Sequence, residues 1–273
     1  MSTLRVSAVA LPIEVGDFAA NLAAIRAALT RAESGRHLIV FTELATSGYV
    51  FAAADEAHTL AMSADDTRLT SLRTAVPQGA VAVVGFCERA GGTLYNSALV
   101  LSADGVLGCY RKAHLWDAEH RIFGVGDEAG TVLDTPIGRL GVAICYDNEF
   151  PEVPRRLALE GADVLALPSN WPLVARPEGE HPPELIQAMA AARSSRLPTV
   201  VADRHGSERG VAWTGGTAVI SPDGWVCATP DAHGVASAVI TTTTDKAVGP
   251  HNDLFTDRRP ELYRLRELAR NDA

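Results

Sequence analysis

This chain of 273 residues has little cysteine, no excess of positive charge and no long apolar run. Its four cysteines are too few for a disulfide scaffold and form no CxxC pair, so we expect reduced thiols. Lys and Arg number 24 against 33 Asp and Glu, which gives a net charge of −9. Such a chain lacks the basic surface that nucleic-acid binding needs, and anionic membranes should repel it. We therefore expect neither nucleic acid nor membrane as a partner.

Targeting and membrane-spanning segments are also missing from the sequence. No stretch approaches the ~18 uninterrupted apolar residues that cross a bilayer. The first twenty residues carry one positive charge and an apolar run too short for a secretory signal, so we expect a cytoplasmic protein. The 47% hydrophobic and 21% charged fractions are typical of a globular chain.

The sequence does contain an alternation of strand and helix patterns. Helices are predicted to begin after Asp17, at Pro151 and at Pro183. Strands are predicted at residues 4–11, 38–41, 80–87, 97–101, 106–110, 141–145, 164–168, 198–202, 217–221 and 235–241. This order favours a layered α/β domain with mixed sheets. We expect one domain over residues 1–245 and a tail over residues 246–273, with a charged helix at 258–270, that packs on a neighbouring subunit.

Three polar residues stand where predicted strands end, which is the usual place for functional groups in α/β folds. They are Glu43, Lys112 and Cys145. A lone Glu or Lys at such a place is more often a solvated surface group, and a lone Cys is more often packed in the core. Cys145 departs from that expectation because it precedes a predicted helix, whose N-terminus would favour the thiolate.

The other cysteines lack this position before a helix, and several common catalytic and metal-binding motifs are absent. Cys87, Cys109 and Cys227 lie in apolar segments, and we interpret them as packing residues. The chain has no GxSxG elbow, no Walker loop, no complete GxGxxG and no HExxH or Cys/His zinc pattern, so we predict no metal and no cofactor. A Cys–His pairing with His114, His120 or His205 as base stays open, although no spacing rule supports it.

Three segments together resemble a known family. Residues 41–49 (FTELATSGY), 110–116 (YRKAHLW) and 145–152 (CYDNEFPE) are similar, in order and spacing, to the Glu, Lys and Cys signatures of the carbon–nitrogen hydrolase, or nitrilase, superfamily. The likeness extends to residues 94–97, 167–171 and 213–224 and covers roughly residues 4–240. It implies an α/β fold built as a four-layer αββα sandwich, and a homodimer or higher homo-oligomer in which the sandwiches of two protomers stack.

The same resemblance implies a role for each matching residue. Cys145 would be the nucleophile, Glu43 the general base and Lys112 the stabiliser of the oxyanion. Many members have a second glutamate beyond the lysine; here Glu119 is the candidate, at a spacing of seven residues where many relatives have eight. The chemistry is coherent without the family, since a base can activate a thiol to attack an amide, and the backbone N–H of Tyr146 can assist Lys112 as an oxyanion donor.

The residues after the cysteine narrow the choice of substrate. Tyr146-Asp147 resembles the amidase and carbamoylase branches, and the flanking segments resemble enzymes acting on short aliphatic amides such as 5-aminopentanamide. We therefore expect hydrolysis of a small linear amide to acid and ammonia, with an N-carbamoyl amine as the alternative. A non-catalytic relative that only binds a ligand stays open. Candidate pocket residues, each of which could equally be ordinary packing, are Trp116, Asn148, Asn170, Trp171 and Trp213.

Overall fold

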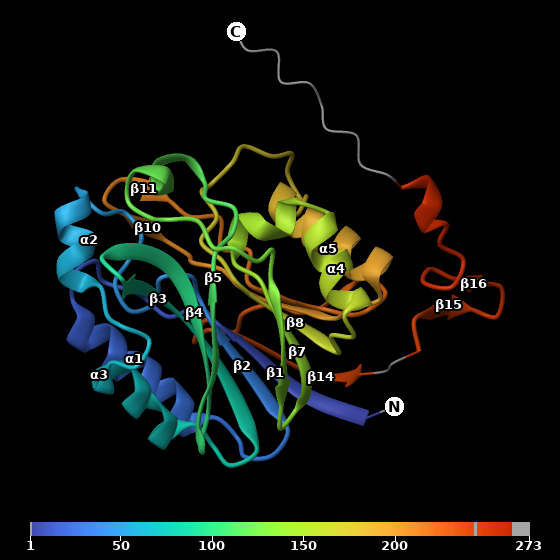
Figure 1. Cartoon of the computed structure of the whole chain (residues 1–273), viewed down its shortest axis with the longest axis horizontal. Coiled ribbons are helices and arrows are strands. Elements are labelled where there is room, and N and C mark those ends of the chain that lie inside the picture. The colour runs from blue at the N-terminus through green and yellow to red at the C-terminus, as the bar shows by residue number, and fades with distance from the viewer. Residues whose placement is uncertain (1, 243–244, 264–273) are drawn as a thin grey trace, which may run out of the picture.

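Two six-stranded sheets form the centre of the molecule in the computed structural model, which describes residues 2–242 and 245–263 (Figure 1). The first sheet has the order β14 (Val235–Thr242), β1 (Ser2–Val9), β2 (His37–Phe41), β3 (Ala80–Ala90), β4 (Thr93–Ser102) and β5 (Gly105–Arg111). The second has the order β13 (Val226–Ala228), β12 (Ala218–Ile220), β9 (Thr199–Ala202), β8 (Val164–Pro168), β7 (Gly138–Val142) and β6 (Thr131–Thr135). In each sheet three neighbouring central strands run parallel: β1, β2 and β3 in the first, and β7, β8 and β9 in the second.

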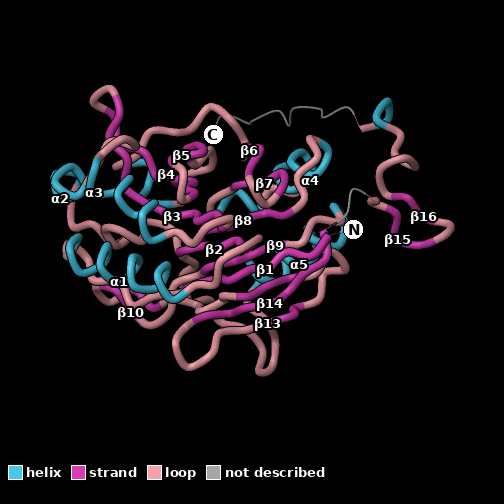
Figure 2. The backbone as a smooth tube through the Cα atoms, turned by 90° about the horizontal axis from the view of Figure 1, so that it is seen from below, coloured by secondary structure: helices cyan, strands magenta, loops and turns pink. Residues whose placement is uncertain are grey.

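Helices cover the outer faces of the two sheets (Figure 2). The first sheet is covered by α1 (Phe18–Arg31), α3 (Thr67–Thr70) and the 3-10 helix η1 (Ser71–Ala75), and the second by α4 (Glu152–Leu159) and α5 (Pro183–Ser195). The remaining elements are α2 (Ala54–Leu60), η2 (Asp117–Arg121), η3 (Cys145–Glu149), η4 (Pro260–Leu262), β10 (Ser207–Glu208), β11 (Val211–Ala212), β15 (Ala247–Gly249) and β16 (Asn252–Asp253). The layers are therefore helix, sheet, sheet and helix, as expected.

The sequence explains why these layers form. The Asp17 carboxylate accepts a hydrogen bond from Ala20 N at 3.0 Å and begins α1. Strand β2 is buried on both faces, because Leu38 and Val40 pack between the sheets whereas Ile39 and Phe41 pack under the helices. A strand buried on both faces shows a continuous apolar run.

Some element boundaries differ from the sequence expectation. The strand predicted over residues 141–145 ends at Val142, and Cys145 already belongs to η3. Of the charged helix predicted at 258–270, the described part contains only the 3-10 turn at Pro260–Leu262, and residues 264–273 lie outside the described residues. The β15–β16 hairpin that precedes it projects from the rest of the molecule (Figure 1).

Two of the three cysteines interpreted as packing residues are not buried. Cys87 is buried on β3, but Cys109 and Cys227 are exposed. That part of the prediction is wrong because β5 and β13 are edge strands of their sheets, so that one side of each strand lacks a neighbouring strand.

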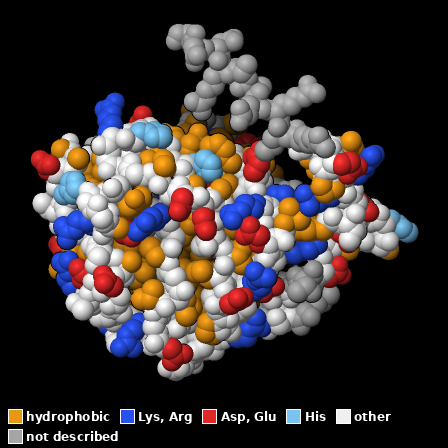
Figure 3. Space-filling model, viewed as in Figure 1, with side chains coloured by type: hydrophobic (Ala, Val, Ile, Leu, Met, Phe, Trp, Pro, Cys, Tyr) orange, Lys and Arg blue, Asp and Glu red, His pale blue; other side chains and the backbone are white. Residues whose placement is uncertain are grey.

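The distribution of charge on the surface and the hydropathy of the helices agree with the pattern of the sequence. Acidic and basic side chains alternate over the face shown in Figure 3, without a continuous basic patch on that face. None of the helices within the described ranges has the length and hydropathy needed to cross a bilayer.

Candidate active site

The three polar residues predicted from strand ends meet in the interior. Glu43 follows β2, Lys112 follows β5 and Cys145 follows β7 after two intervening residues. Their exposed fractions are 0%, 1% and 5%. Lys112 Nζ donates to Glu43 Oε1 at 2.8 Å. Because the two sheets face each other, the carboxyl ends of strands from both can contribute to one site.

Glu119 belongs to the same cluster. Lys112 Nζ lies 2.9 and 2.8 Å from its two carboxylate oxygens. Glu119 stands in the short helix η2, where its Oε2 also accepts from the backbone N–H of Trp116 at 2.6 Å. The compact η2 turn brings this carboxylate to the lysine despite the short spacing.

A residue that the sequence analysis did not single out connects the two glutamates. Asn96 Nδ2, on β4, donates to Glu43 Oε1 at 2.7 Å and to Glu119 Oε1 at 2.8 Å. The signals for Asn96 were its place in residues 94–97, which share the family likeness, and its polarity inside a largely apolar strand. With Asn96 and Lys112 both bonded to Oε1, the buried Oε2 of Glu43 has no hydrogen-bond partner among the described residues. That oxygen is available to accept a proton.

Burial controls the protonation of this cluster. It raises the pKa of Glu43 to about 7; Lys112 opposes this rise and Glu119 adds to it. Burial lowers the pKa of Lys112, but the negative charges of Glu43 and Glu119 outweigh it and raise that pKa well above its ordinary value. The cluster therefore holds a charged lysine next to a carboxylate that can take up a proton near neutral pH.

The expectation that a following helix would favour the Cys145 thiolate is wrong. Burial, and then the charge of Glu43, raise the pKa of Cys145 well above its ordinary value, although Lys112 and a backbone hydrogen bond from Asn170 lower it. The element that begins here is the 3-10 helix η3 of only five residues, so its end effect is small compared with burial. Cys145 is therefore held as a thiol, and a base is needed to ionise it.

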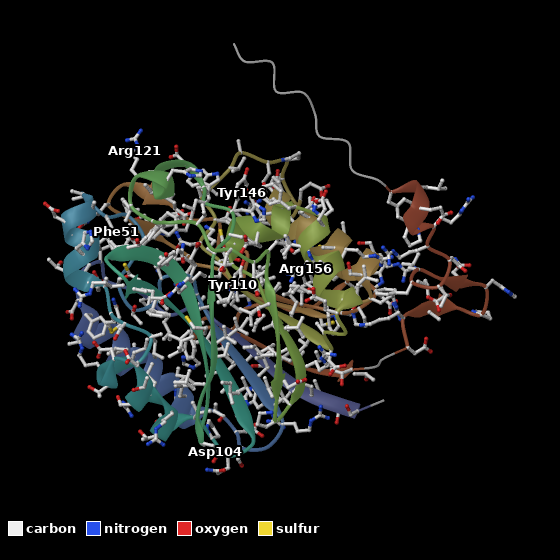
Figure 4. The ribbon with its side chains drawn as sticks, viewed as in Figure 1. Phe51, Asp104, Tyr110, Arg121, Tyr146 and Arg156 are labelled. Atoms are coloured by element: carbon white, nitrogen blue, oxygen red, sulfur yellow. The ribbon has the colours of Figure 1, made fainter. Side chains whose placement is uncertain are left out.

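A buried carboxylate holds the turn that presents Cys145. Cys145 has φ of +48°, a backbone conformation that L residues rarely adopt. Asp147 Oδ2 accepts from Ile144 N at 2.9 Å and from the Tyr110 hydroxyl at 2.8 Å, and its Oδ1 accepts from His114 N at 3.0 Å. Figure 4 shows Tyr110 near the centre of the molecule, with Tyr146 above it. These bonds compensate for the strained backbone.

None of the three candidate histidines is placed as a base for Cys145. The His114 ring bonds to Asp147 Oδ1 through Nδ1 at 2.8 Å, and His120 and His205 are exposed. The charged groups that act on the Cys145 thiol are instead Glu43, Lys112 and Glu119. The Cys–His alternative is therefore not supported. Within the described ranges, no group of three His, Cys, Asp or Glu side chains is placed to hold a metal ion.

A cavity of about 140 Å³ opens onto Cys145. Of the predicted pocket residues, the structure places Trp116, Asn170 and Trp171 in its wall, together with Tyr146, the predicted oxyanion donor. Residues that the sequence analysis did not single out also line it, and they are Tyr49, Glu149, Pro172, Val174 and Glu184.

Two predicted pocket residues are not part of this wall. Asn148 is buried in η3, and Trp213 packs edge-on against Tyr49 with ring centroids 5.6 Å apart. A 3-10 helix has three residues per turn, so Asn148 is expected on the same side of η3 as Cys145. The cavity wall nevertheless contains its neighbours Tyr146 and Glu149 and not Asn148. Trp213 supports the cavity through Tyr49 rather than lining it.

Comparisons of the sequence with known proteins agree with a carbon–nitrogen hydrolase site. The family description "Carbon-nitrogen hydrolase" fits residues 5–248. The chain belongs to this family. It is 36% identical to a nitrilase of Pyrococcus abyssi, over 85% of this chain and 87% of the relative. It is 35% identical to an (R)-stereoselective amidase of a Pseudomonas species, over 82% and 79%.

The fold also resembles that of a solved amidase structure. A double mutant of the amidase from Nesterenkonia sp. AN1, in complex with acrylamide, superposes with a TM-score of 0.76 at 25% identity, covering 97% of both chains. The sequence-based predictions of family, αββα fold and a cysteine-dependent carbon–nitrogen hydrolase are therefore confirmed.

Proposed function

We propose that this carbon–nitrogen hydrolase cleaves a small linear primary amide to a carboxylic acid and ammonia, through a thioester on Cys145. The observation that carries the proposal is the unpartnered Oε2 of Glu43, held in a buried cluster with Lys112 and Glu119 at the cavity that contains Cys145. A solvated or purely structural glutamate has no reason to keep a buried oxygen without a donor.

The acylation step uses this oxygen as the base. Glu43 Oε2 takes the proton from the Cys145 thiol as the sulfur attacks the amide carbon. When the tetrahedral intermediate collapses, the protonated Glu43 gives that proton to the departing nitrogen. Ammonia leaves and Cys145 carries the acyl group. A carboxyl whose pKa is about 7 is suited to both transfers near neutral pH.

Lys112 and Tyr146 stabilise the oxyanion of the intermediate. One N–H of Lys112 is directed at Glu43, and one can be shared between the two oxygens of Glu119, which leaves a third for the substrate oxygen. The backbone N–H of Tyr146 is the second donor. Loss of one such donor typically lowers the rate by ~10²–10³.

Water completes the cycle. Glu43, again a carboxylate after the amine has left, removes a proton from a water molecule that attacks the thioester carbon. The acid leaves, and the thiolate takes the proton back from Glu43. Glu119 holds Lys112 and Asn96 in place throughout, so that the oxyanion donor stays oriented during both half-reactions.

The size of the cavity supports a small substrate. Its volume of about 140 Å³ lies below the ~300–1,000 Å³ of sites for drug-sized ligands. An N-carbamoyl amine is the second candidate, because the same four residues can cleave a ureido group. Its carbonyl centre differs from that of an amide only by the second nitrogen.

Ammonia release from a panel of primary amides, ureido compounds and nitriles tests the proposal. We expect the highest kcat/KM for a linear primary amide and no turnover by the folded Cys145→Ala variant. A panel without turnover, together with no labelling of Cys145 by a thiol reagent, would favour a binding protein instead. A preference for ureido compounds would favour the second candidate.

A further inference from the structure

A second cavity, of about 580 Å³, lies on the outer face of the first sheet. Its floor is formed by alternate side chains of β14, β1 and β2, and its sides by the end of α1 and the loop before β14. None of the described residues in its wall belongs to the wall of the cavity that contains Cys145. The volume falls within the ~300–1,000 Å³ that is typical of small-molecule sites.

A chain of hydrogen bonds crosses the floor of this cavity. Ser7 Oγ lies 2.9 Å from His37 Nε2 and 2.9 Å from Ser237 Oγ. His37 Nδ1 lies 3.1 Å from the carbonyl oxygen of Glu33, which can only accept, so Nδ1 carries the proton of the ring and Nε2 accepts from Ser7. Burial lowers the pKa of His37, which keeps the ring neutral and this tautomer in place near neutral pH.

The direction of these bonds determines what Ser237 offers to a ligand. A serine hydroxyl has a single proton, and Ser7 uses its own on His37. The bond between the two serines therefore takes the proton of Ser237. Ser237 is exposed, and with its proton engaged it has only lone pairs left for a ligand. It can bind a hydrogen-bond donor but not an acceptor.

The two sides of the cavity carry opposite charges. Arg31, in the last turn of α1, is exposed and has no ion-pair or hydrogen-bond partner within residues 2–242 and 245–263. The other arginine of the wall, Arg5, is already paired with Glu33. On the β14 side, Asp231 accepts from two nearby backbone N–H groups at 2.8 and 3.0 Å but forms no ion pair in the same ranges. Arg31 and Asp231 are therefore both available to a ligand.

The rest of the floor is apolar. Val9 and Ile39 are 4% and 1% exposed and belong to the layer between the first sheet and its helices. Ala28, Ala32 and Val235 complete this apolar part. It suits a branched aliphatic group of a few carbon atoms, which is removed from water there.

We propose that this cavity is a binding site for a free amino acid with an apolar side chain. Arg31 binds the carboxylate, Ser237 accepts from the ammonium group with Asp231 as its counter-charge, and the side chain lies on the apolar floor. The site does not depend on the proposed reaction, because it shares no wall residue with the cavity at Cys145.

The two polar walls together favour a zwitterion over a singly charged ligand. A simple carboxylate has no donor for Ser237, and a simple amine leaves Arg31 without a partner. A molecule that carries both groups satisfies both walls, and each charge-assisted hydrogen bond contributes to its affinity.

Isothermal titration calorimetry of the full chain with three related probes tests this proposal. The probes are L-leucine, 4-methylpentanoate, which lacks only the amino group, and isopentylamine, which lacks only the carboxylate. We expect L-leucine to bind ~10-fold more tightly than either of the other two. Equal affinities for the three probes, or no binding of L-leucine, would overturn the proposal.

Two variants assign the two halves of this preference to the cavity. Arg31→Gln should remove the advantage of L-leucine over isopentylamine, and Ser237→Ala should reduce its advantage over 4-methylpentanoate. The matched control is Arg89→Gln, which removes the same charge as Arg31→Gln from an exposed position outside this wall. Unchanged affinity ratios in Arg31→Gln and Ser237→Ala, with both variants folded by circular dichroism, would contradict the assignment.

The alkylation of Cys145 by iodoacetamide, followed on its peptide by mass spectrometry, distinguishes this cavity from the catalytic one. L-leucine should leave the rate of alkylation unchanged, because it binds on the outer face of the first sheet. If L-leucine slows the alkylation and Arg31→Gln does not change its affinity, the amino acid occupies the catalytic cavity and the proposed site is wrong.

Discussion

At the scale of single residues, the two oxygens of Glu43 have different environments. Oε1 accepts hydrogen bonds from Lys112 and Asn96, whereas Oε2 has no partner among the described residues. The carboxylate is thus oriented by one oxygen and reactive through the other. An oriented base needs no rearrangement before it takes the proton from the thiol.

The protonation of Glu43 predicts the pH dependence of the enzyme. A base must be deprotonated to act, and burial raises its pKa from 4.5 to about 7. The value of kcat/KM should therefore fall as the pH decreases through about 7 and be nearly constant just above it. A pH–rate profile with a stable substrate measures this; a fall only near pH 4.5 would mean that burial does not raise the pKa of Glu43.

Asn96 should adjust this pH dependence. Its hydrogen bond lowers the pKa of Glu43, so its removal in Asn96→Ala should move the acidic limb upward by about one pH unit. It should also lower the maximal kcat by ~10-fold because the carboxylate loses orientation. The same pH–rate measurement reports both effects. An unshifted limb with reduced kcat would assign Asn96 a packing role only.

At the scale of secondary-structure elements, two of the proposed catalytic residues, Cys145 and Glu43, lie in loops held by buried polar groups. Asp147 fixes the turn from β7 into η3. Arg204 follows β9, and its Nη2 donates to the carbonyl oxygens of Glu43 at 3.1 Å and Leu44 at 3.3 Å. Leu44 has φ of +47°, so this loop holds a strained residue next to Glu43, whereas in the turn at Cys145 the strained residue is Cys145 itself.

The ion pair between Arg204 and Glu208 should therefore stabilise the fold and support activity. Arg204 Nη1 bonds to the buried Glu208, which accepts from the backbone N–H groups of Tyr49 and Val50. Arg204→Met leaves Glu208 buried without its partner and should lower the free energy of unfolding by ~3–5 kcal/mol. Urea denaturation measures this loss. The double variant Arg204→Met/Glu208→Gln should recover part of the stability, whereas equal losses in both would contradict the ion-pair account.

The sequence predicts some elements of this arrangement better than others. Continuous apolar runs such as β8 are predicted with the bounds that the structure shows, since a strand buried on both faces leaves a local pattern. The end of β7 is not, because the η3 turn is stabilised by Asp147 bonding to Tyr110 and His114, which are distant in sequence. Local periodicity carries no information on such contacts.

The same reasoning applies to the site. Glu43, Lys112 and Cys145 are predictable because each follows a strand and belongs to a recognisable segment. The role of Asn96 is not, although residues 94–97 share the family likeness, because that role arises from the convergence of β4 on residues from other elements. A single asparagine in a strand shows nothing of that convergence.

At the scale of the whole molecule, we propose that two copies associate and that the C-terminal tail contributes to the contact. In the described residues the tail is anchored to its own subunit at two places. Lys246 Nζ donates to the carbonyl oxygens of Ala162 at 3.3 Å and Arg196 at 3.1 Å, and Arg155 donates to the carbonyl oxygen of Leu254 and lies over the Phe255 ring. The β15–β16 hairpin between these places projects outward.

Removal of residues 258–273 should therefore weaken the dimer without unfolding the subunit. Light scattering coupled to size-exclusion chromatography over a concentration series measures the mass. We expect a dimer for the full chain and a larger monomer fraction for the shortened one, with unchanged far-ultraviolet circular dichroism. A monomeric full chain, or an equally stable shortened dimer, would contradict the proposal.

The central claim of this account is that Cys145 carries the acyl group during turnover. Acid quenching of the enzyme during steady-state hydrolysis of 5-aminopentanamide, or of hexanamide, followed by peptide mass spectrometry, tests it most directly. We predict a mass increase equal to the acyl group minus one hydrogen on the peptide that contains Cys145, and neither this adduct nor ammonia from Cys145→Ala. Turnover by Cys145→Ala at the rate of the unaltered enzyme would contradict the account.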